Sequence, residues 1–318
     1  MKIIDVHSHF VCPGYAEYLR KHNKENEDGF PTPKWSIEKH LDYMKKVGIE
    51  KCVLSLSSPH FYCESEKEMF TLAKEIDTYA SNCKKEYPKS FLFASSLPVP
   101  YIDMSIDYVD YVYDVLDADA IKLPSNANGM YLGDVRYEPL YKKLNEREGI
   151  IFVHPTAPQS YPKDCFTSEV LPLFEFIADT TRSIIDLIVS GMLEKYSNIK
   201  FIIPHCGSFL PNVVNRIEEI TKALGNCVCV QKSLQSFYFD IAGDSSQIKN
   251  LLTLTDEDHI LFGGDFPYTP VAQIEEKVNS VLKNKEYVSI MDKIMYKNAE
   301  KLLLGYKKNK NQKNIDFI

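Results

Sequence analysis

Histidine and aspartate side chains stand at the ends of several apolar runs in this sequence. Asp5, His7 and His9 fall two residues apart in "KIIDVHSHF", so in a strand they point to the same side. Three further runs end on the same residue types: "IIFVHP" on His154, "KFIIPHCG" on His205 and "ILFGGDFP" on Asp265. Imidazole and carboxylate groups together suit zinc or another borderline divalent ion. These residue types therefore predict a metal site, provided that the fold brings the four segments together.

Such a site would support enzyme chemistry. A divalent ion lowers the pKa of a bound water and withdraws electron density from a bound substrate. An imidazole that does not bind the ion can take up or deliver a proton. The alternative is that each histidine only forms a hydrogen bond at a strand end, which is ordinary for one such residue. Five such groups at or near the ends of apolar runs favour the metal site; they are His7, His9, His154, His205 and Asp265.

The elements that would position these groups form a regular series. Apolar runs typical of β-strands alternate with stretches of helical periodicity, and the runs are Lys2–His7, Lys51–Leu56, Ser90–Ser95, Asp119–Leu123, Ile150–His154, Lys200–His205, Ser236–Ile241 and His259–Asp265. Eight βα units in succession predict a (β/α)8 TIM barrel, an α/β fold. All strands of that barrel end at one mouth, so the predicted ligands meet there.

Helix signals lie between the runs. Ser36 is expected to cap a helix that Gly48 ends, and Ser65 with Glu68 forms a capping-box pattern before a second helix. The segment Pro211–Gly225 shows the same order, with proline near its start and glycine at its end. Two polar insertions, Phe10–Pro33 and Pro155–Ser168, follow the first and fifth strands and are expected to cover the mouth as loops.

The composition is that of a globular protein and limits its partners. Of the 318 residues 44% are hydrophobic, and the net charge of −7 argues against binding to nucleic acid.

The basic run Tyr306–Asn314 belongs to a C-terminal tail, residues 306–318, after a single predicted domain at residues 1–305. No run reaches the roughly 18 apolar residues of a membrane span, and no signal peptide is evident, so we expect a cytoplasmic protein. Scattered cysteines are expected to be thiols.

Taken together, these motifs resemble the amidohydrolase superfamily, in particular the branch of 2-amino-3-carboxymuconate-6-semialdehyde decarboxylase and the γ-resorcylate-type decarboxylases. The resemblance rests on "DVHSHF", "PKWSIEKHLDYMKKVGIEKCVLSLSSP", "FVHP", "PHCG" and "GGDFP", which occur in the required order. The stretch "DTTRSIIDLIVSGMLEKYSNIKFIIPHCGSFLP" is the most specific to the branch. The resemblance covers nearly the whole chain, and it implies a barrel enzyme with one divalent metal ion, zinc first and manganese second.

The resemblance also implies roles for individual residues. It makes His7, His9, His154 and Asp265 the metal ligands and His205 the catalytic base, with Asp265 also taking part in catalysis. It further implies that Arg216 reaches into a neighbouring subunit to hold a substrate carboxylate, which predicts a homodimer or a larger even-numbered assembly. From the residues alone, Arg216 would be a solvated helix residue.

Other residues keep two interpretations. Lys34 is the only positive charge in "EDGFPTPKW", where the semialdehyde enzymes carry an arginine, and it is a candidate contact for the substrate. His60 is a second candidate substrate contact, and Arg182 is either an anion contact or an interface salt-bridge residue. Lys122 ends the fourth strand, where a carboxylated lysine bridges two metals in other amidohydrolases; the branch resemblance implies a structural lysine instead.

Three functions follow from these observations. The first is a metal-dependent lyase that removes CO2 from a small aromatic or unsaturated carboxylic acid. The second is a metal-dependent hydrolase of an amide, lactone or ester, or a hydratase, on the same barrel. The third is a barrel that only binds a ligand or partner, which retention of all five polar groups disfavours.

Overall fold

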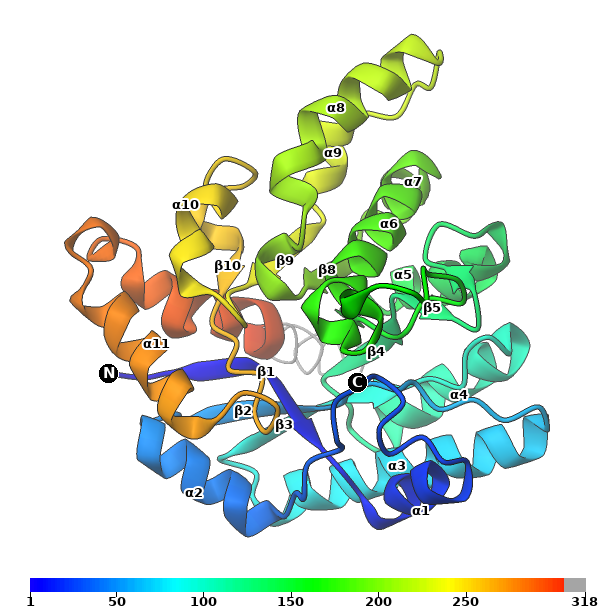
Figure 1. The fold of residues 1–318 in the computed structure, drawn as a ribbon, viewed down its shortest axis with the longest axis vertical. Helices are drawn as coiled ribbons and strands as arrows, with labels where there is room; N and C mark the ends of the chain where they lie inside the picture. Colours follow the sequence, from blue (N-terminus) through cyan, green and yellow to red (C-terminus); the bar gives the residue numbers. More distant parts are fainter. Residues whose placement is uncertain (306–318) are drawn as a thin grey trace, which may run out of the picture.

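The computed structural model describes residues 1–305 and contains the predicted barrel. Eight parallel strands follow one another around it: β1 (Ile4–Phe10), β2 (Lys51–Leu56), β3 (Phe91–Ser96), β4 (Ala120–Pro124), β7 (Ile150–His154), β8 (Lys200–Ile203), β9 (Phe237–Asp240) and β10 (Ile260–Leu261). Helices surround these strands in Figure 1. The prediction of a (β/α)8 barrel is confirmed. The predicted tail, residues 306–318, lies outside the described residues.

Backbone hydrogen bonds between the segment after β10 and β1 close the barrel. Val6 N donates to Phe262 O at 3.0 Å, and His9 N donates to Phe266 O at 2.7 Å. The Asp265 N–H donates in turn to His7 O at 2.7 Å. The first and last predicted ligand segments, more than 250 residues apart in sequence, therefore become neighbours.

Only two of the eight predicted strands, Lys51–Leu56 and Ile150–His154, have the same bounds in the structure, and the differences that affect the site are in the first, sixth and last strands. The first runs on to Phe10, because it stays paired with β2 as far as Leu56 after an irregularity in register between Asp5 and Ser8. The last is limited to Ile260–Leu261, and its continuation to Asp265 is not part of a regular ladder, although Phe266 forms an isolated parallel bridge with Ser8. His205 also lies beyond its strand, since its φ of 54° is incompatible with an extended ladder.

The helices surround the barrel in the predicted order. Their bounds are α1 Pro13–Lys21, α2 Ile37–Val47, α3 Glu66–Glu86, α4 Ile102–Asp114, α5 Glu138–Glu146, α6 Glu175–Val189, α7 Met192–Lys195, α8 Leu210–Ala223, α9 Val230–Leu234, α10 Ile248–Leu251 and α11 Val271–Lys283. The predicted caps of α2 are confirmed, because the Ser36 side chain accepts from Lys39 N and Gly48 ends the helix with φ 83°. Ser65 caps α3 in the same way through Glu68 N.

The first insertion contains a helix that the sequence analysis treated as loop. Helix α1 begins at Pro13 and buries Tyr15, Tyr18 and Leu19, so its apolar face outweighs the polar composition of the segment. The rest of the insertion meets the chain beyond β7, where Leu171 N donates to Asp28 O at 3.0 Å. Among the described residues, no helix combines the length and apolar character needed to cross a bilayer.

The lower part of the barrel is a packed hydrophobic core. Inward side chains such as Val6, Val53 and Phe152 form one cluster with Leu302 and Leu303 of the C-terminal π-helical turn Glu300–Leu304. This cluster fills the end of the barrel opposite the predicted ligands. Access to the ligands is therefore from the mouth.

Candidate active site

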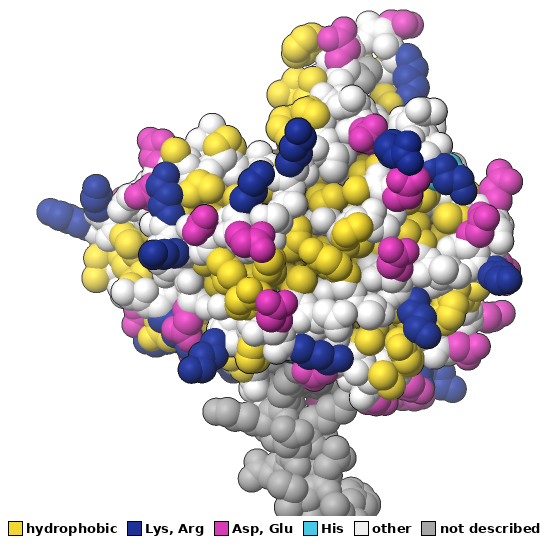
Figure 2. Space-filling view, turned by 90° about the horizontal axis from the view of Figure 1, so that it is seen from below, with side chains coloured by type: hydrophobic (Ala, Val, Ile, Leu, Met, Phe, Trp, Pro, Cys, Tyr) yellow, Lys and Arg dark blue, Asp and Glu magenta, His cyan; other side chains and the backbone are white. Residues whose placement is uncertain are grey.

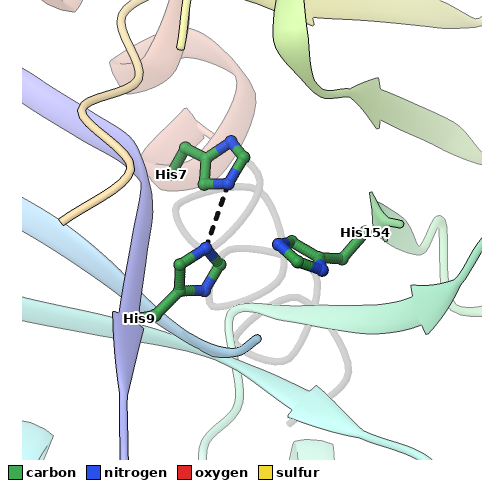
Figure 3. A group of neighbouring side chains, drawn as sticks. All are labelled: His7, His9 and His154. Carbon is green, nitrogen blue, oxygen red and sulfur yellow. Dashed lines mark hydrogen bonds between the residues drawn. The ribbon is translucent and has the colours of Figure 1, made fainter. Parts of the chain in front are cut away.

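Three histidines from two strands converge at the mouth of the barrel. His7 and His9 come from β1 and His154 from the end of β7, and all three are buried. The Nε2 atoms of His7 and His9 are 3.1 Å apart, and one ring nitrogen of each histidine lies within 4.8 Å of the others. Figure 3 shows the three rings directed at a common point. The barrel brings these predicted ligands together.

Asp265 completes the set from the segment after β10. Its Oδ1 lies 3.2 Å from His9 Nε2 and 3.6 Å from His7 Nε2. The two glycines before it allow this approach, because a Cβ on Gly264 would lie 2.3 Å from the Tyr43 hydroxyl and 2.7 Å from Asp5 Oδ2. Asp265 itself has φ 61°, which re-aims its side chain towards the histidines.

The four side chains fit a divalent metal ion. Two ligand atoms about 2.1 Å from one ion at a tetrahedral angle are about 3.4 Å apart, close to the separations observed here. Burial lowers the pKa values of His9 and His154 and keeps their rings neutral. Burial would raise the pKa of Asp265, but the hydrogen bond with His9 and the neighbouring imidazoles lower it to about 2. Neutral imidazole and ionised carboxylate are the forms that bind metal. Burial would lower the pKa of His7, but Asp240 raises it to about 9, so this ring would release a proton when an ion binds.

Two buried carboxylates support the ligands, and one of them, Asp240, was missed in the sequence analysis. Asp240 Oδ2 accepts from His7 Nδ1 at 2.8 Å, which leaves Nε2 of that ring for a metal ion. Asp5 lies beneath the site, where Oδ1 accepts from the backbone N–H groups of His7 and Gly264, and Oδ2 accepts from Tyr43. A signal for Asp240 was present, because it is the carboxylate within the apolar run Ser236–Ile241, one residue before the end of that run.

His205 approaches the cluster from a tight turn after β8. Residues His205, Cys206, Gly207 and Ser208 all have positive φ, and the His205 N–H donates to Asp240 Oδ1 at 3.0 Å. The ring centroids of His205 and His7 are 5.1 Å apart. Burial lowers the pKa of His205 to about 4, and Nδ1 has no hydrogen-bond partner among the described residues. A neutral ring with an unpaired nitrogen beside the ligands is suited to proton transfer.

A cavity of about 510 Å³ opens above these groups. His154, His205 and Asp265 belong to its floor, and its lining also includes the hydrophobic or aromatic residues Phe30, Phe176, Ile177, Phe209 and Tyr268. Polar side chains complete it, among them Asp28, Ser57 and Ser58. No lysine or arginine of the described part of the chain lines this cavity. Its size and largely apolar wall suit one small ring-shaped ligand.

The four predicted substrate contacts lie outside the lining of this cavity. His60 is buried behind it with Nε2 3.1 Å from Val99 O, and Lys34 is exposed along a separate groove beside Trp35. The guanidinium of Arg182 donates to Asp179 at 2.8 Å. Arg216 is an exposed residue of α8, so within one chain it does not reach the cavity.

Lys122 is buried within the barrel, and the pKa of His154 is lowered by burial and in part by the charge of Lys122. Its ammonium group has no hydrogen-bond partner among the described residues, and burial lowers its pKa to about 7. Its position near His154 leaves both interpretations of Lys122, structural or carboxylated, as predictions.

Comparison with known proteins agrees with this geometry. The family described as amidohydrolase matches residues 4–304 of the chain. The chain is 31% identical over 298 residues to decarboxylase macB of Penicillium terrestre, covering 87% of this chain and 88% of that protein. It is 27% identical over 281 residues to a 6-methylsalicylic acid decarboxylase of Penicillium expansum, covering 85% of this chain and 86% of that protein. These relatives support decarboxylation over hydrolysis.

Solved structures show the same fold. A crystal structure described as an amidohydrolase II superposes with a TM-score of 0.91 at 32% identity, covering 95% of this chain and 99% of the other. A second structure is a 5-carboxyvanillate decarboxylase of Novosphingobium aromaticivorans with bound manganese. It superposes with a TM-score of 0.83 at 20% identity, covering 95% of this chain and 96% of the other. The geometry and these comparisons together support a divalent metal ion in the histidine cluster.

Proposed function

The chain belongs to the amidohydrolase family, and from this premise we propose that it is a metal-dependent decarboxylase of a small aromatic or unsaturated carboxylic acid. The observation that carries the proposal is the convergence of His7, His9, His154 and Asp265 on one point, with His205 beside them at the floor of a closed-ended cavity. No redox cofactor is needed, because the carbon that loses CO2 receives a proton in its place.

A divalent ion held by these four side chains would act as a Lewis acid that polarises the substrate and stabilises the negative charge left when CO2 departs. Zinc is our first choice, since three imidazoles and one carboxylate are typical ligands for it. Manganese is the second, as in the solved 5-carboxyvanillate decarboxylase. Asp240 fixes the tautomer of His7 that leaves Nε2 free to bind.

The residues of the chain manage the proton and the surroundings of the substrate. His205, which is neutral at rest, takes up a proton on Nδ1, the atom without a partner, from an acidic group of the bound substrate or from water. It then transfers this proton to the carbon as the carbon–carbon bond to CO2 breaks, and returns to its neutral form. Asp265, which is ionised, assists because its negative charge favours the protonated form of His205. Phe176, Phe209 and Tyr268 exclude water from the reacting carbon, which strengthens these electrostatic interactions.

A substrate carboxylate is negatively charged and would be stabilised by a positively charged side chain. The described residues of one chain place no lysine or arginine in the cavity lining. We propose that Arg216 of a second copy supplies this positive charge, with Lys34 as a further candidate, in a homodimer or a larger even-numbered assembly. Exposed apolar residues near the cavity support this arrangement: Leu173 is 57% exposed, Phe174 43% and Phe209 36%. Arg182 lines the groove formed by Phe174 and Phe209, so an interface salt bridge is the role we propose for it.

Nucleic acid is not a partner in this proposal. The net charge is −7, and on the face shown in Figure 2 basic side chains are interspersed with acidic ones instead of forming one basic surface. A cytoplasmic site of action stays a prediction.

The proposal is tested by metal analysis of the purified protein and by CO2 release from a panel of hydroxybenzoates and muconate-like acids. We expect about one divalent ion per chain, and release of CO2 that His205→Ala abolishes. Protein that binds no metal, or that releases CO2 equally well after His205→Ala, would contradict the scheme. Gel filtration with light scattering measures the assembly, and an Arg216→Ala variant that raises KM supports the shared site.

A further inference from the structure

The wall of the cavity contains a carboxyl group that the proposed reaction does not use. Asp28 lies in the segment between α1 and α2 and is only 6% exposed, although it lines the cavity. Its Oδ1 atom is buried and has no hydrogen-bond partner among the described residues. A buried carboxylate oxygen without a donor is costly, so this group requires a partner that the protein itself does not provide.

The backbone holds Asp28 in place. Leu171 N donates to Asp28 O at 3.0 Å, which ties the first insertion to the segment after β7. The next residue, Gly29, has φ 69°, and a Cβ there would lie only 1.7 Å from Glu169 O. Such close packing leaves the Asp28 backbone little freedom. The carboxyl group is therefore a fixed part of the wall.

No cation among the described residues pairs directly with Asp28, and the attraction of the nearby Lys24 is outweighed by the repulsion of Glu27. The closest lysine in sequence, Lys24, pairs with Glu27 at 2.8 Å, and the lining of the cavity among residues 1–305 contains neither lysine nor arginine. Burial raises the pKa of Asp28 to about 6, while a hydrogen bond from Ser58 opposes this rise. At pH 7.5 the group is therefore mainly a carboxylate that can accept a hydrogen bond.

Aromatic side chains connect the histidine cluster to the part of the wall next to Asp28. The Tyr268 ring packs edge-on against His9, with centroids 5.6 Å apart, and its centroid lies 6.0 Å from that of Phe30, two residues after Asp28. A flat substrate ring that binds at the histidines can extend along Tyr268. A substituent at its far edge then approaches the Asp28 wall.

We propose that Asp28 is a specificity-determining residue that accepts a hydrogen bond from a ring hydroxyl of the substrate. This inference rests on the proposed function and narrows it to phenolic acids that carry a hydroxyl at an edge remote from the metal ligands. A second carboxylate of the substrate at that position would be repelled by the carboxylate of Asp28. An alkyl group there would leave Oδ1 without a donor, which disfavours such a substrate.

The test uses the full-length, manganese-loaded protein and compares ligands that differ by one ring hydroxyl. Binding is measured by calorimetry at pH 7.5 with 2-nitrophenol and with the same compound carrying one added hydroxyl at each other ring position. These probes contain no carboxylate, so turnover does not disturb the measurement. CO2 release from the matching series of 2-hydroxybenzoates is measured in parallel.

We expect at least one added hydroxyl to tighten binding by about 10- to 100-fold, the range of a hydrogen bond to a charged group. Asp28→Asn, which keeps the shape of the side chain, should reduce that gain by about tenfold, and Asp28→Ala should remove it. Glu27→Gln is the matched control, since it neutralises the adjacent but exposed carboxylate, and it should retain the gain. Thermal unfolding of each variant verifies the fold.

The inference is overturned when no added hydroxyl improves binding to the wild type, or when the gain persists in both Asp28 variants. Failure of the decarboxylase proposal looks different: no 2-hydroxybenzoate loses CO2, whatever the binding series shows. If CO2 is released but Asp28 has no effect on the preference for an added hydroxyl, the inference about Asp28 is rejected and the decarboxylase proposal is not.

Discussion

The floor and the wall of the cavity are built in different ways. The floor consists of side chains on the barrel strands, such as His9 and His154, and of Asp265 in the segment after β10. Their positions follow from the strand ladders and from the backbone hydrogen bond of Asp265 N to His7 O. The wall includes Asp28 and Phe30, which come from a connecting segment and depend on contacts such as that with Leu171. In this family of folds the strands provide the chemistry, and the loops provide the selection of substrate. The predictions below separate these two roles.

Loss of a metal ligand should have the largest effect. His154→Ala removes one of the buried imidazoles, so we expect metal content to fall to near zero and activity to decrease by about 10³-fold or more. Atomic emission on purified protein and a CO2 assay measure both. His22→Ala, at an exposed position, is the control and should behave as wild type. Full activity with no bound metal in the His154 variant would refute the role of the floor.

Weakening the support behind a ligand should have a smaller effect. Asp240→Asn alters the hydrogen bond that orients His7, and we expect metal affinity to decrease by about 10- to 100-fold. Competition with a chelator measures this affinity. A matched control is Asp256→Asn, because Asp256 forms a similar pair with His259, 2.6 Å apart, on the surface. Equal losses in the two variants would show that the effect is not specific to the site.

A change in the wall should affect substrate binding and leave the metal in place. Gly29→Ala adds a Cβ that collides with Glu169 O, so we expect the Asp28 segment to shift and KM to rise about tenfold. Gly48→Ala is the control, since it has a similar positive φ but no atom within 4 Å of the added Cβ. That variant should lower Tm by only a few degrees with KM unchanged. Reduced metal content in Gly29→Ala would contradict the separation of floor and wall.

The smallest effect concerns the pH dependence of the stability of the protein, through His40, which is buried beneath the cavity floor. Burial lowers the pKa of His40 to about 3, and its neutral Nδ1 accepts from Trp35 at 3.0 Å. The unfolded chain takes up a proton at this residue below pH 6.5 and the folded chain does not, so stability decreases as the pH falls through 6.5.

His40→Gln keeps an acceptor for Trp35 without this titration. We expect the free energy of unfolding to depend less on pH between 6 and 4, by up to about 1.4 kcal/mol per pH unit. Urea unfolding of the metal-free protein measures the difference. An unchanged slope would show that other buried histidines dominate, and His22→Gln, at an exposed position, should leave the slope as in wild type.

Several features could be predicted from the sequence for a definite physical reason. The caps at Ser36, Gly48 and Ser65 are local, since each depends on backbone groups within a few residues. The predicted ligands are also visible, because a polar residue that ends an apolar strand stands out against its neighbours. Asp240 is less visible, because the apolar run Ser236–Ile241 continues past it to Ile241.

Other features depend on contacts between distant segments. The sequence alone determined the order of strands and helices and the residue types at the mouth, because periodicity and capping act over short distances. Only the tertiary structure decided that Asp265 meets His9 and that Asp28 faces the cavity without a donor, since both result from packing between segments far apart in the chain. It also decided that Lys34 and Arg216 lie outside the cavity of their own chain, because charge and residue type do not specify where an exposed side chain points.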